Sequence, residues 1–205
     1  CAIVAGGVKC WGEMHRADLI QSATPVDIEL PPGVEIRSIA TGYHASCAAD
    51  AAGDVYCWGN GLYDKIETPV KISGLPAGRI IDLAMNRAGV CALHGSGSVY
   101  CWGGVLHDYQ QIAGQYGANV FAPVEQPTLV EGISGAVDIA AGEEHICARL
   151  VDGQITCWGS NYSGQRGNGG APPFVYPWHS PVQVTAYTGA VGAVSAGGYH
   201  TCAVR

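Results

Sequence analysis

Cysteine is the residue type of this chain with the widest chemistry, because its thiol can form disulfides, bind metals or act as a nucleophile. Eight of the nine cysteines form four pairs, and in each pair the second cysteine precedes Trp-Gly and follows the first by nine or ten residues. This pattern predicts four disulfides, with metal ligation and reduced core thiols as the alternatives. Cys202 opens a fifth unit and is predicted to be unpaired. The predicted pairs are Cys1 with Cys10, Cys47 with Cys57, Cys91 with Cys101, and Cys147 with Cys157.

The spacing of the reactive residues disfavours both metal binding and catalysis. Zinc sites use Cys-x-x-Cys or clustered histidines, and the sequence has neither. Histidine is the usual acid or base near neutral pH, but His145 and His200 recur at the same place in two units, as structural residues do. The nucleophile and phosphate-binding motifs of common enzymes are also missing. We therefore predict a protein without enzymatic activity, catalytic residues, bound metal or cofactor.

The composition disfavours several classes of partner. The net charge is −7, and the chain has only three lysines, Lys9, Lys65 and Lys71. An acidic surface repels phosphate, so nucleic acid and anionic membranes are poor partners. No run of apolar residues reaches the roughly 18–20 residues that a membrane span needs. Charged residues make up 13% of the chain, below the about 25% of a typical soluble domain, so small polar residues must form much of the surface.

The paired cysteines require short antiparallel hairpins to bring them together. Runs of four to seven residues alternate in polarity and are separated by Gly, Pro, Asn and Asp, which predicts strands rather than helices. Pairing Cys47 with Cys57 leaves a short turn near Gly53. Directly opposed cysteines in such a hairpin lie within the reach of a disulfide. The tryptophan that follows each second cysteine then points to the other face of the sheet.

The hairpins recur in units of about 44 to 56 residues with four short strands each, which is the size of a β-propeller blade. We predict an all-β fold with a single propeller region over residues 1–205. About four blades are present, so we expect an arc of a larger propeller. Because a blade buries its faces only against neighbouring blades, stability is shared between adjacent units. The predicted units are 1–35 (partial), 36–79, 80–136, 137–190 and 191–205 (partial).

The fourth unit carries a family resemblance. Its strings Ala-Ala-Gly-Glu-Glu-His-Ile-Cys-Ala at 140–148 and Asp-Gly-Gln-Ile-Thr-Cys-Trp-Gly-Ser-Asn-Tyr-Ser-Gly-Gln-Arg-Gly at 152–167 resemble the repeat of the regulator of chromosome condensation family. The resemblance implies an arc of a seven-bladed propeller, and the cysteine-paired variant is similar to bacterial, exported members. Arg166 stands where the family usually has Leu. Members include a nucleotide exchange factor and a secreted β-lactamase inhibitor, so the resemblance is specific for fold and not for function.

Two long loops, 106–122 and 160–180, carry aromatic residues, which are common anchors at protein interfaces. Covering the outer edge of a blade is an equally good role for these side chains. Glu143 and Glu144 are predicted to lie at a rim between two strands. The string Asn-Tyr-Ser at 161–163 matches a glycosylation sequon but coincides with the asparagine of the repeat. The candidate partner contacts in the two loops are Tyr109, Tyr116, Phe121, Tyr162, Phe174, Tyr176, Trp178 and His179.

These observations lead to three function hypotheses. The first is a non-enzymatic protein-interaction or scaffold module that presents propeller loops to a protein or cell-envelope partner. Because disulfides persist in oxidising compartments, this module is expected outside the cell or on its surface. The second, implied by the family resemblance, is guanine-nucleotide exchange on a small GTPase, which the paired cysteines disfavour since cytosolic thiols stay reduced. The third is an enzyme that uses the propeller channel.

Overall fold

The described part of the chain consists of β-strands joined by turns and loops. The computed structural model describes residues 1–13, 21–59, 66–87, 89–103, 124–169, 180–185, 187 and 189–205. These residues form five antiparallel sheets that follow one another along the sequence. The predicted all-β class is therefore confirmed. Within these segments no helix is long and apolar enough to cross a membrane.

Three of the sheets have four strands each, and neighbouring strands follow one another in the sequence. The first contains β4 (Ile36–Thr41), β5 (Ala45–Asp50), β6 (Val55–Gly59) and β7 (Ile66–Lys71). The second contains β8 (Ile80–Met85), β9 (Gly89–His94), β10 (Val99–Gly103) and β11 (Val124–Leu129). The third contains β12 (Ala136–Ala141), β13 (His145–Leu150), β14 (Ile155–Gly159) and β15 (Val182–Gln183).

A smaller sheet flanks this series on each side. Before it come the three strands β1 (Ala2–Val4), β2 (Gly7–Glu13) and β3 (Gln21–Ile28). After it come the two strands β16 (Ala193–Ala196) and β17 (Thr201–Val204). The register Ser195 opposite Cys202 in the last sheet matches Ala140 opposite Cys147 in β12 and β13. Strand β16 is therefore equivalent to β12, and β17 is equivalent to β13.

The cysteine hairpins have the register that the sequence predicts. Cys47 in β5 lies opposite Cys57 in β6, and the equivalent pairing recurs in β9 with β10 and in β13 with β14. The first hairpin turns at Ala5 and Gly6, with φ angles of 51° and 79°. Two positive φ angles in a row are typical of a two-residue turn that matches the twist of the strands.

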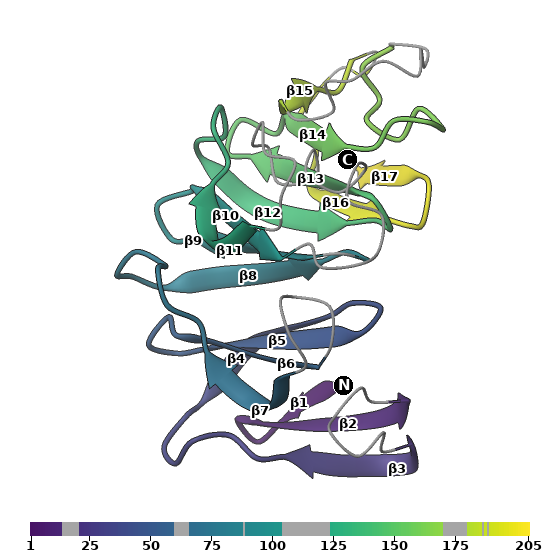
Figure 1. Cartoon of the computed structure of the whole chain (residues 1–205). Coiled ribbons are helices and arrows are strands. Elements are labelled where there is room, and N and C mark those ends of the chain that lie inside the picture. Colours follow the sequence, from purple (N-terminus) through teal and green to yellow (C-terminus); the bar gives the residue numbers. More distant parts are fainter. Residues whose placement is uncertain are drawn as a thin grey trace.

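The sheets stack one upon another in chain order. Figure 1 shows β1–β3 at the bottom, β4–β7 and β8 above them, and β12–β15 with β16 and β17 in the upper part. Contacts between sheets run largely through the first strand of each: β4 packs beside β8, β8 beside β12, and β12 beside β16. Strands that converge in this way are the inner strands of propeller blades. The described sheets form an arc of such blades.

The core of the arc lies between the blades. Trp58, Trp102 and Trp158 are at most 4% exposed, whereas Trp11 in the first sheet is 47% exposed. The largest apolar cluster combines buried side chains from all three four-stranded sheets. Each blade therefore depends on its neighbours to cover its apolar faces.

Every inner strand of the four-stranded sheets carries a bulge at the same place. The register with the second strand shifts just before Ser38 in β4, Asp82 in β8 and Asp138 in β12. An extra residue of this kind breaks the regular alternation and re-aims the side chains next to it. These three polar residues thus occupy equivalent positions on successive inner strands.

Candidate functional site

The paired cysteines form disulfides that join the two strands of each hairpin. Disulfides join Cys1 to Cys10, Cys47 to Cys57, Cys91 to Cys101 and Cys147 to Cys157, with Cα atoms 3.9–4.1 Å apart. The six cysteines of the four-stranded sheets are fully buried. Cys202 carries a free, exposed thiol on β17. In the described segments, no three His, Cys, Asp or Glu side chains are grouped so that they could hold a metal ion.

His145 joins two blades through its ring. The side chain is fully buried, and its Nε2 lies 2.9 Å from Oγ1 of Thr201 in the next blade. Because the Thr201 hydroxyl donates to the backbone oxygen of Gln165 at 2.9 Å, His145 must donate its Nε2–H to Thr201. The other ring nitrogen, Nδ1, is buried with no hydrogen-bond partner among the described residues.

Burial lowers the pKa of His145 to about 4, and the neighbouring His200 contributes to the same effect. Burial has this effect because a proton on Nδ1 would lie in the interior without an acceptor. The ring is therefore neutral at pH 7 and holds two blades together. It is not placed to exchange protons near neutral pH.

The Gly-Gln-Arg-Gly string at 164–167 folds back to the same junction. The Gln165 side chain is buried, accepts the backbone N–H of Ser163 at 2.8 Å and donates to Ser160 Oγ at 3.3 Å. Its backbone oxygen receives the Thr201 hydroxyl described above. This string therefore anchors the loop of one blade to β17 of the next.

The polar residues of the inner strands also connect blades. Ser38 Oγ donates to Asp82 Oδ1 at 3.1 Å, which links β4 to β8. Asp138 accepts the backbone N–H of Val194 at 3.3 Å, which links β12 to β16, and pairs with Arg149 Nε at 3.5 Å. Burial raises the pKa of Asp82, and the hydrogen bonds from Leu83 N–H and Ser38 oppose that rise. These two carboxylates are engaged in bonds between blades.

A series of exposed or half-buried side chains lies on the turns that follow the inner strands. We call it the rim row: Tyr43, Arg87, Glu143 and Tyr199, from four successive blades. The Arg87 guanidinium lies 5.9 Å from the centre of the Tyr43 ring and 3.9 Å from Glu143 Oε1. The Glu143 carboxylate in turn lies close enough to the Tyr199 hydroxyl to raise its pKa. Each member therefore contacts the next across a blade boundary, although Tyr43 and Tyr199 are 67% and 53% exposed.

The backbone holds these turns side by side. Arg87 N–H donates to the Glu143 backbone oxygen at 3.1 Å, and Glu143 N–H donates to the Gly198 oxygen at 3.1 Å. Within each turn, the residue after the inner strand also bonds to the start of the second strand, as Gly142 N–H does to the His145 oxygen at 2.9 Å. The rim row consequently stands on a rigid support, although its side chains face the solvent.

Two sequence profiles, both described as the Regulator of chromosome condensation (RCC1) repeat, match this chain. One matches residues 36–64 and 136–165, and the other matches residues 152–204. The chain therefore carries repeats of the regulator of chromosome condensation type at residues 36–64 and 136–204. No curated protein matches it significantly in sequence.

Several solved structures have the same fold as this chain. Human WBSCR16 superposes with a TM-score of 0.79 at 22% identity, over 97% of this chain and 53% of that one. Yeast RCC1 (Prp20) bound to Kap60 gives 0.77 at 25% identity, over 97% and 50%. Prp20p from Saccharomyces cerevisiae, described with its binding to Gsp1p and histones, gives 0.79 at 25% identity, over 94% and 49%. The chain thus spans about half the length of these propellers, and the predicted regulator of chromosome condensation fold is confirmed.

The asparagine of the regulator of chromosome condensation repeat has a structural role here. Asn161 is 8% exposed, and its Oδ1 accepts the backbone N–H of Arg166 at 2.9 Å. Its Nδ2 donates to Asn168 Oδ1 at 3.4 Å. An amide used in this way is a poor glycan acceptor, so the match to a sequon belongs to the repeat itself.

The ends of the third strands and the rim row share one face of the arc. In each blade the second strand starts, and the third strand ends, next to the rim turn, as the pairing of His145 with Gly159 demonstrates. Loops that leave the third strands therefore begin on the rim face. Tyr162 follows β14 there and is 39% exposed. The other candidate contacts lie outside the described residues: Tyr109, Tyr116, Phe121, Phe174, Tyr176, Trp178 and His179.

Sequence reasoning placed Glu143 and Glu144 at a rim but missed the other members of the rim row. Tyr43, Arg87 and Glu143 each stand two residues after an inner strand. Aligning the units on that strand would have found them. Their different residue types concealed the shared position.

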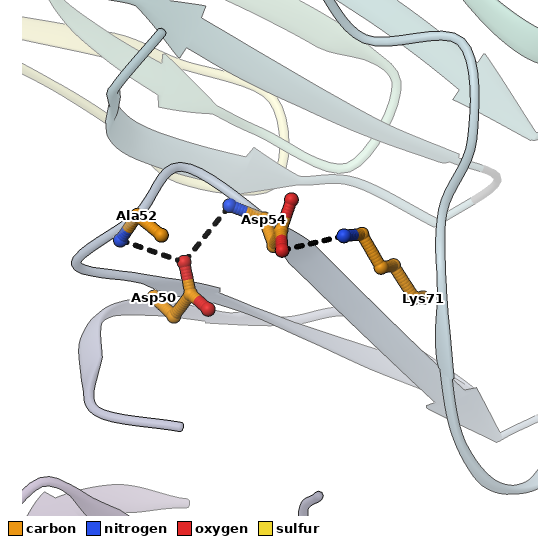
Figure 2. A network of polar contacts seen from close by, with 4 residues as sticks. All are labelled: Asp50, Ala52, Asp54 and Lys71. Carbon is orange, nitrogen blue, oxygen red and sulfur yellow. Dashed lines mark hydrogen bonds and ion pairs between the residues drawn. The ribbon is translucent and has the colours of Figure 1, made fainter. Parts of the chain in front are cut away.

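The opposite face carries hairpin turns that are closed by polar contacts (Figure 2). Asp50 Oδ1 accepts the backbone N–H groups of Ala52 and Asp54, both at 2.9 Å. Lys71 Nζ pairs with Asp54 Oδ2 at 2.6 Å, and this hydrogen bond is the main cause of the raised pKa of Lys71. These contacts fix a turn to the outer strand of its own blade.

Proposed function

We propose that this chain is a non-enzymatic module that binds a protein or cell-envelope partner through the rim face of its propeller, outside the reducing cytosol. In this proposal, residues 1–205 act as one propeller region. The rim turns supply fixed contacts, and the long loops beside them supply the variable ones. The candidate aromatic residues of the two long loops contact the same partner in this proposal.

The observation that carries the proposal is the rim row. Tyrosine and arginine are the residue types most often found at energetically important positions of interfaces. Here they are exposed, yet each is held by a neighbour across a blade boundary. Side chains that are already ordered lose less conformational entropy when a partner binds.

The disulfides support the choice of compartment. Four bonds within 205 residues are typical of proteins in oxidising surroundings and rare in the cytosol. The net charge of −7 disfavours nucleic acid as the partner. A protein partner at the cell surface or in the cell envelope satisfies both conditions.

Site-specific photocrosslinking tests the binding surface. A benzoylphenylalanine at Tyr43 is expected to capture the partner from an extract of the native source. The matched control carries the same group at Val151, which is 78% exposed on the hairpin face. An adduct that forms equally at both positions, or at Val151 alone, contradicts the proposal. The yield of the partner adduct at position 43 is also expected to fall when Arg87 is changed to Ala.

A second candidate is the regulation of a small GTPase, as the family resemblance implies. The likeness to Prp20p, which is described with its binding to Gsp1p, favours this candidate. Both candidates use a propeller face to bind a protein, so they differ chiefly in compartment.

Counting thiols in the denatured, unreduced protein separates the two candidates. In protein isolated from its native source, the eight paired cysteines within residues 1–205 are expected to resist alkylation before reduction and to react after it. Alkylation of these eight cysteines before reduction would instead support a cytosolic regulator, because glutathione and thioredoxin keep cytosolic thiols reduced.

A further inference from the structure

We infer that the end of the rim row around Tyr199 receives a lysine or arginine side chain from a basic segment of the protein partner. The acceptor consists of the exposed Tyr199 ring with the carboxylates of Glu143 and Glu144. This inference rests on the proposed function, because it takes the rim face as the binding surface. It adds the charge and the residue type of the partner.

The rim row already holds one cation in the same manner. Arg87 lies 5.9 Å from the Tyr43 ring centre and 3.9 Å from the Glu143 carboxylate. A cation near an aromatic ring and a carboxylate gains from both the ring quadrupole and the opposite charge. Arg87 thus provides an internal example of the contact that we assign to the partner.

One blade further along, the Tyr199 ring lies near the Glu143 carboxylate, whose Oε1 faces Arg87, and near Glu144. Glu143 Oε2 lies 3.7 Å from the place that a Cβ on Gly198 would occupy, so this carboxylate oxygen lies beside the turn that carries Tyr199. Glu144 forms no ion pair with any described residue. The Tyr199 ring is 53% exposed. Ring and carboxylate are therefore both accessible to a group from outside.

The electrostatic field at this end of the row is negative. The pKa of Tyr199 is raised, first by its hydrogen bond to Glu143 and then by the charge of Glu143, with a further contribution from Glu144. The positive charge of Arg87 opposes this rise without cancelling it. A raised phenol pKa indicates surroundings that resist negative charge and attract positive charge. The net charge of −7 acts in the same direction at longer range.

An acidic partner fits the rim row less well. Arg87 is its only cation, and its guanidinium already faces Glu143 and the Tyr43 ring. An incoming carboxylate would approach Arg87 past Glu143 and would be repelled. The charge of the rim therefore favours a basic segment.

Binding of a defined peptide tests the inference. The probe is a fluorescein-labelled peptide of alternating arginine and glycine, compared with the same peptide in which neutral citrulline replaces arginine. Fluorescence anisotropy with the disulfide-bonded chain gives Kd at two salt concentrations. We expect the arginine peptide to bind at least tenfold more tightly than the citrulline peptide, with an advantage that shrinks as salt rises.

Variants locate the binding. Glu143→Gln with Glu144→Gln is expected to weaken binding roughly tenfold, and Tyr199→Leu roughly fivefold, whereas Tyr199→Phe keeps the ring and stays near the wild type. The charge-matched control is Glu29→Gln with Glu131→Gln, two exposed carboxylates on the links of the opposite face. This control is expected to change Kd less than twofold. Equal unfolding midpoints in urea establish that the variants remain folded.

Three outcomes overturn the inference. The first is an equal loss in the control pair, which would mean that the peptide senses only the overall charge. The second is an unchanged Kd in both Tyr199→Leu and the double glutamate variant. The third is preferential binding of an acidic peptide that Arg87→Gln abolishes. Photocrosslinking at Tyr43 would still succeed in the third case, so the proposed function would stand while the partner chemistry assigned here fails.

Discussion

At the residue scale, His145 and Thr201 illustrate how reactive side chains are used for assembly. The imidazole donates to the threonine hydroxyl, which donates to the Gln165 carbonyl. Deleting the hydroxyl would leave a donor and an acceptor unpaired in the interior. An unsatisfied buried group of this kind costs about 1–3 kcal/mol. This chain of bonds connects β13, the 164–167 string and β17.

Acid is expected to destabilise the fold through His145. The folded-state pKa is about 4 against an ordinary value of 6.5, so the unfolded chain binds the proton first as the pH falls. The contribution to stability is complete above pH 6.5 and is lost toward pH 4. The free energy of unfolding should thereby fall by about 2–3 kcal/mol. Urea titrations at several pH values across this window measure the effect.

His145→Asn serves as the control for this titration. Asparagine keeps a donor near Thr201 but carries no titratable group. The variant is expected to lose this part of the pH dependence. At pH 7 it should lose less stability than His145→Ala would. A pH profile identical to that of the wild type would show that His145 is not responsible.

At the element scale, the rim turns pack closely against one another and also bring side chains to the surface. The His145 ring lies against one side of Gly142, and the Gly197 carbonyl lies against the other. A Cβ at position 142 would collide with both. The same relation recurs between Gly197 and the His200 ring. Because the turn is this compact, the following residues, Glu143 and Glu144, are brought to the surface at the blade boundary.

Gly142→Ala is expected to destabilise the protein by about 2–4 kcal/mol, since both colliding groups belong to rigid parts of the structure. The matched control is Gly192→Ala, where the nearest atom to the new Cβ is the Val204 oxygen at 3.6 Å. That change should stay within about 0.5 kcal/mol. The urea unfolding midpoints of the two variants test this prediction. Equal midpoints would mean that the rim turn tolerates a side chain.

At the scale of the whole molecule, the blades are not independent units. Trp102 in the middle sheet is fully buried in a cluster that includes Ala49 of the sheet before it and Ile146 of the sheet after it. Polar bonds between inner strands run across the same boundaries. A change in one blade should therefore be felt in its neighbours, as expected for stacked repeats.

Trp102→Ala is expected to lower stability by about 3–5 kcal/mol and to reduce amide protection in β4–β7 and β12–β15 as well as in its own sheet. Hydrogen exchange followed by mass spectrometry measures this spread. Trp11→Ala is the control, because that indole is 47% exposed, and its effect should stay below about 1 kcal/mol. Loss of protection confined to β8–β11 would contradict coupling between blades.

Much of the fold could be predicted from local sequence pattern. Alternation of polarity specifies strands, and two cysteines ten residues apart specify a hairpin register, because both depend on neighbours in the chain. The Cys47 and Cys57 pairing and the turn at Ala5 and Gly6 follow from such short-range rules. The repeat of these hairpins indicates a propeller, since each small sheet needs neighbours to bury its faces.

The candidate site depends on relations that no local pattern contains. Tyr43, Arg87, Glu143 and Tyr199 are separated by more than forty residues from one to the next and share no common residue type across all four. They meet because the inner strands stack and the turns bond side by side. Hydrogen bonding of His145 to Thr201, 56 residues away, arises in the same way. The sequence by itself determined the blades, whereas the stacking of blades in three dimensions decided which side chains face a partner, because contacts across a blade boundary exist only after the sheets have packed.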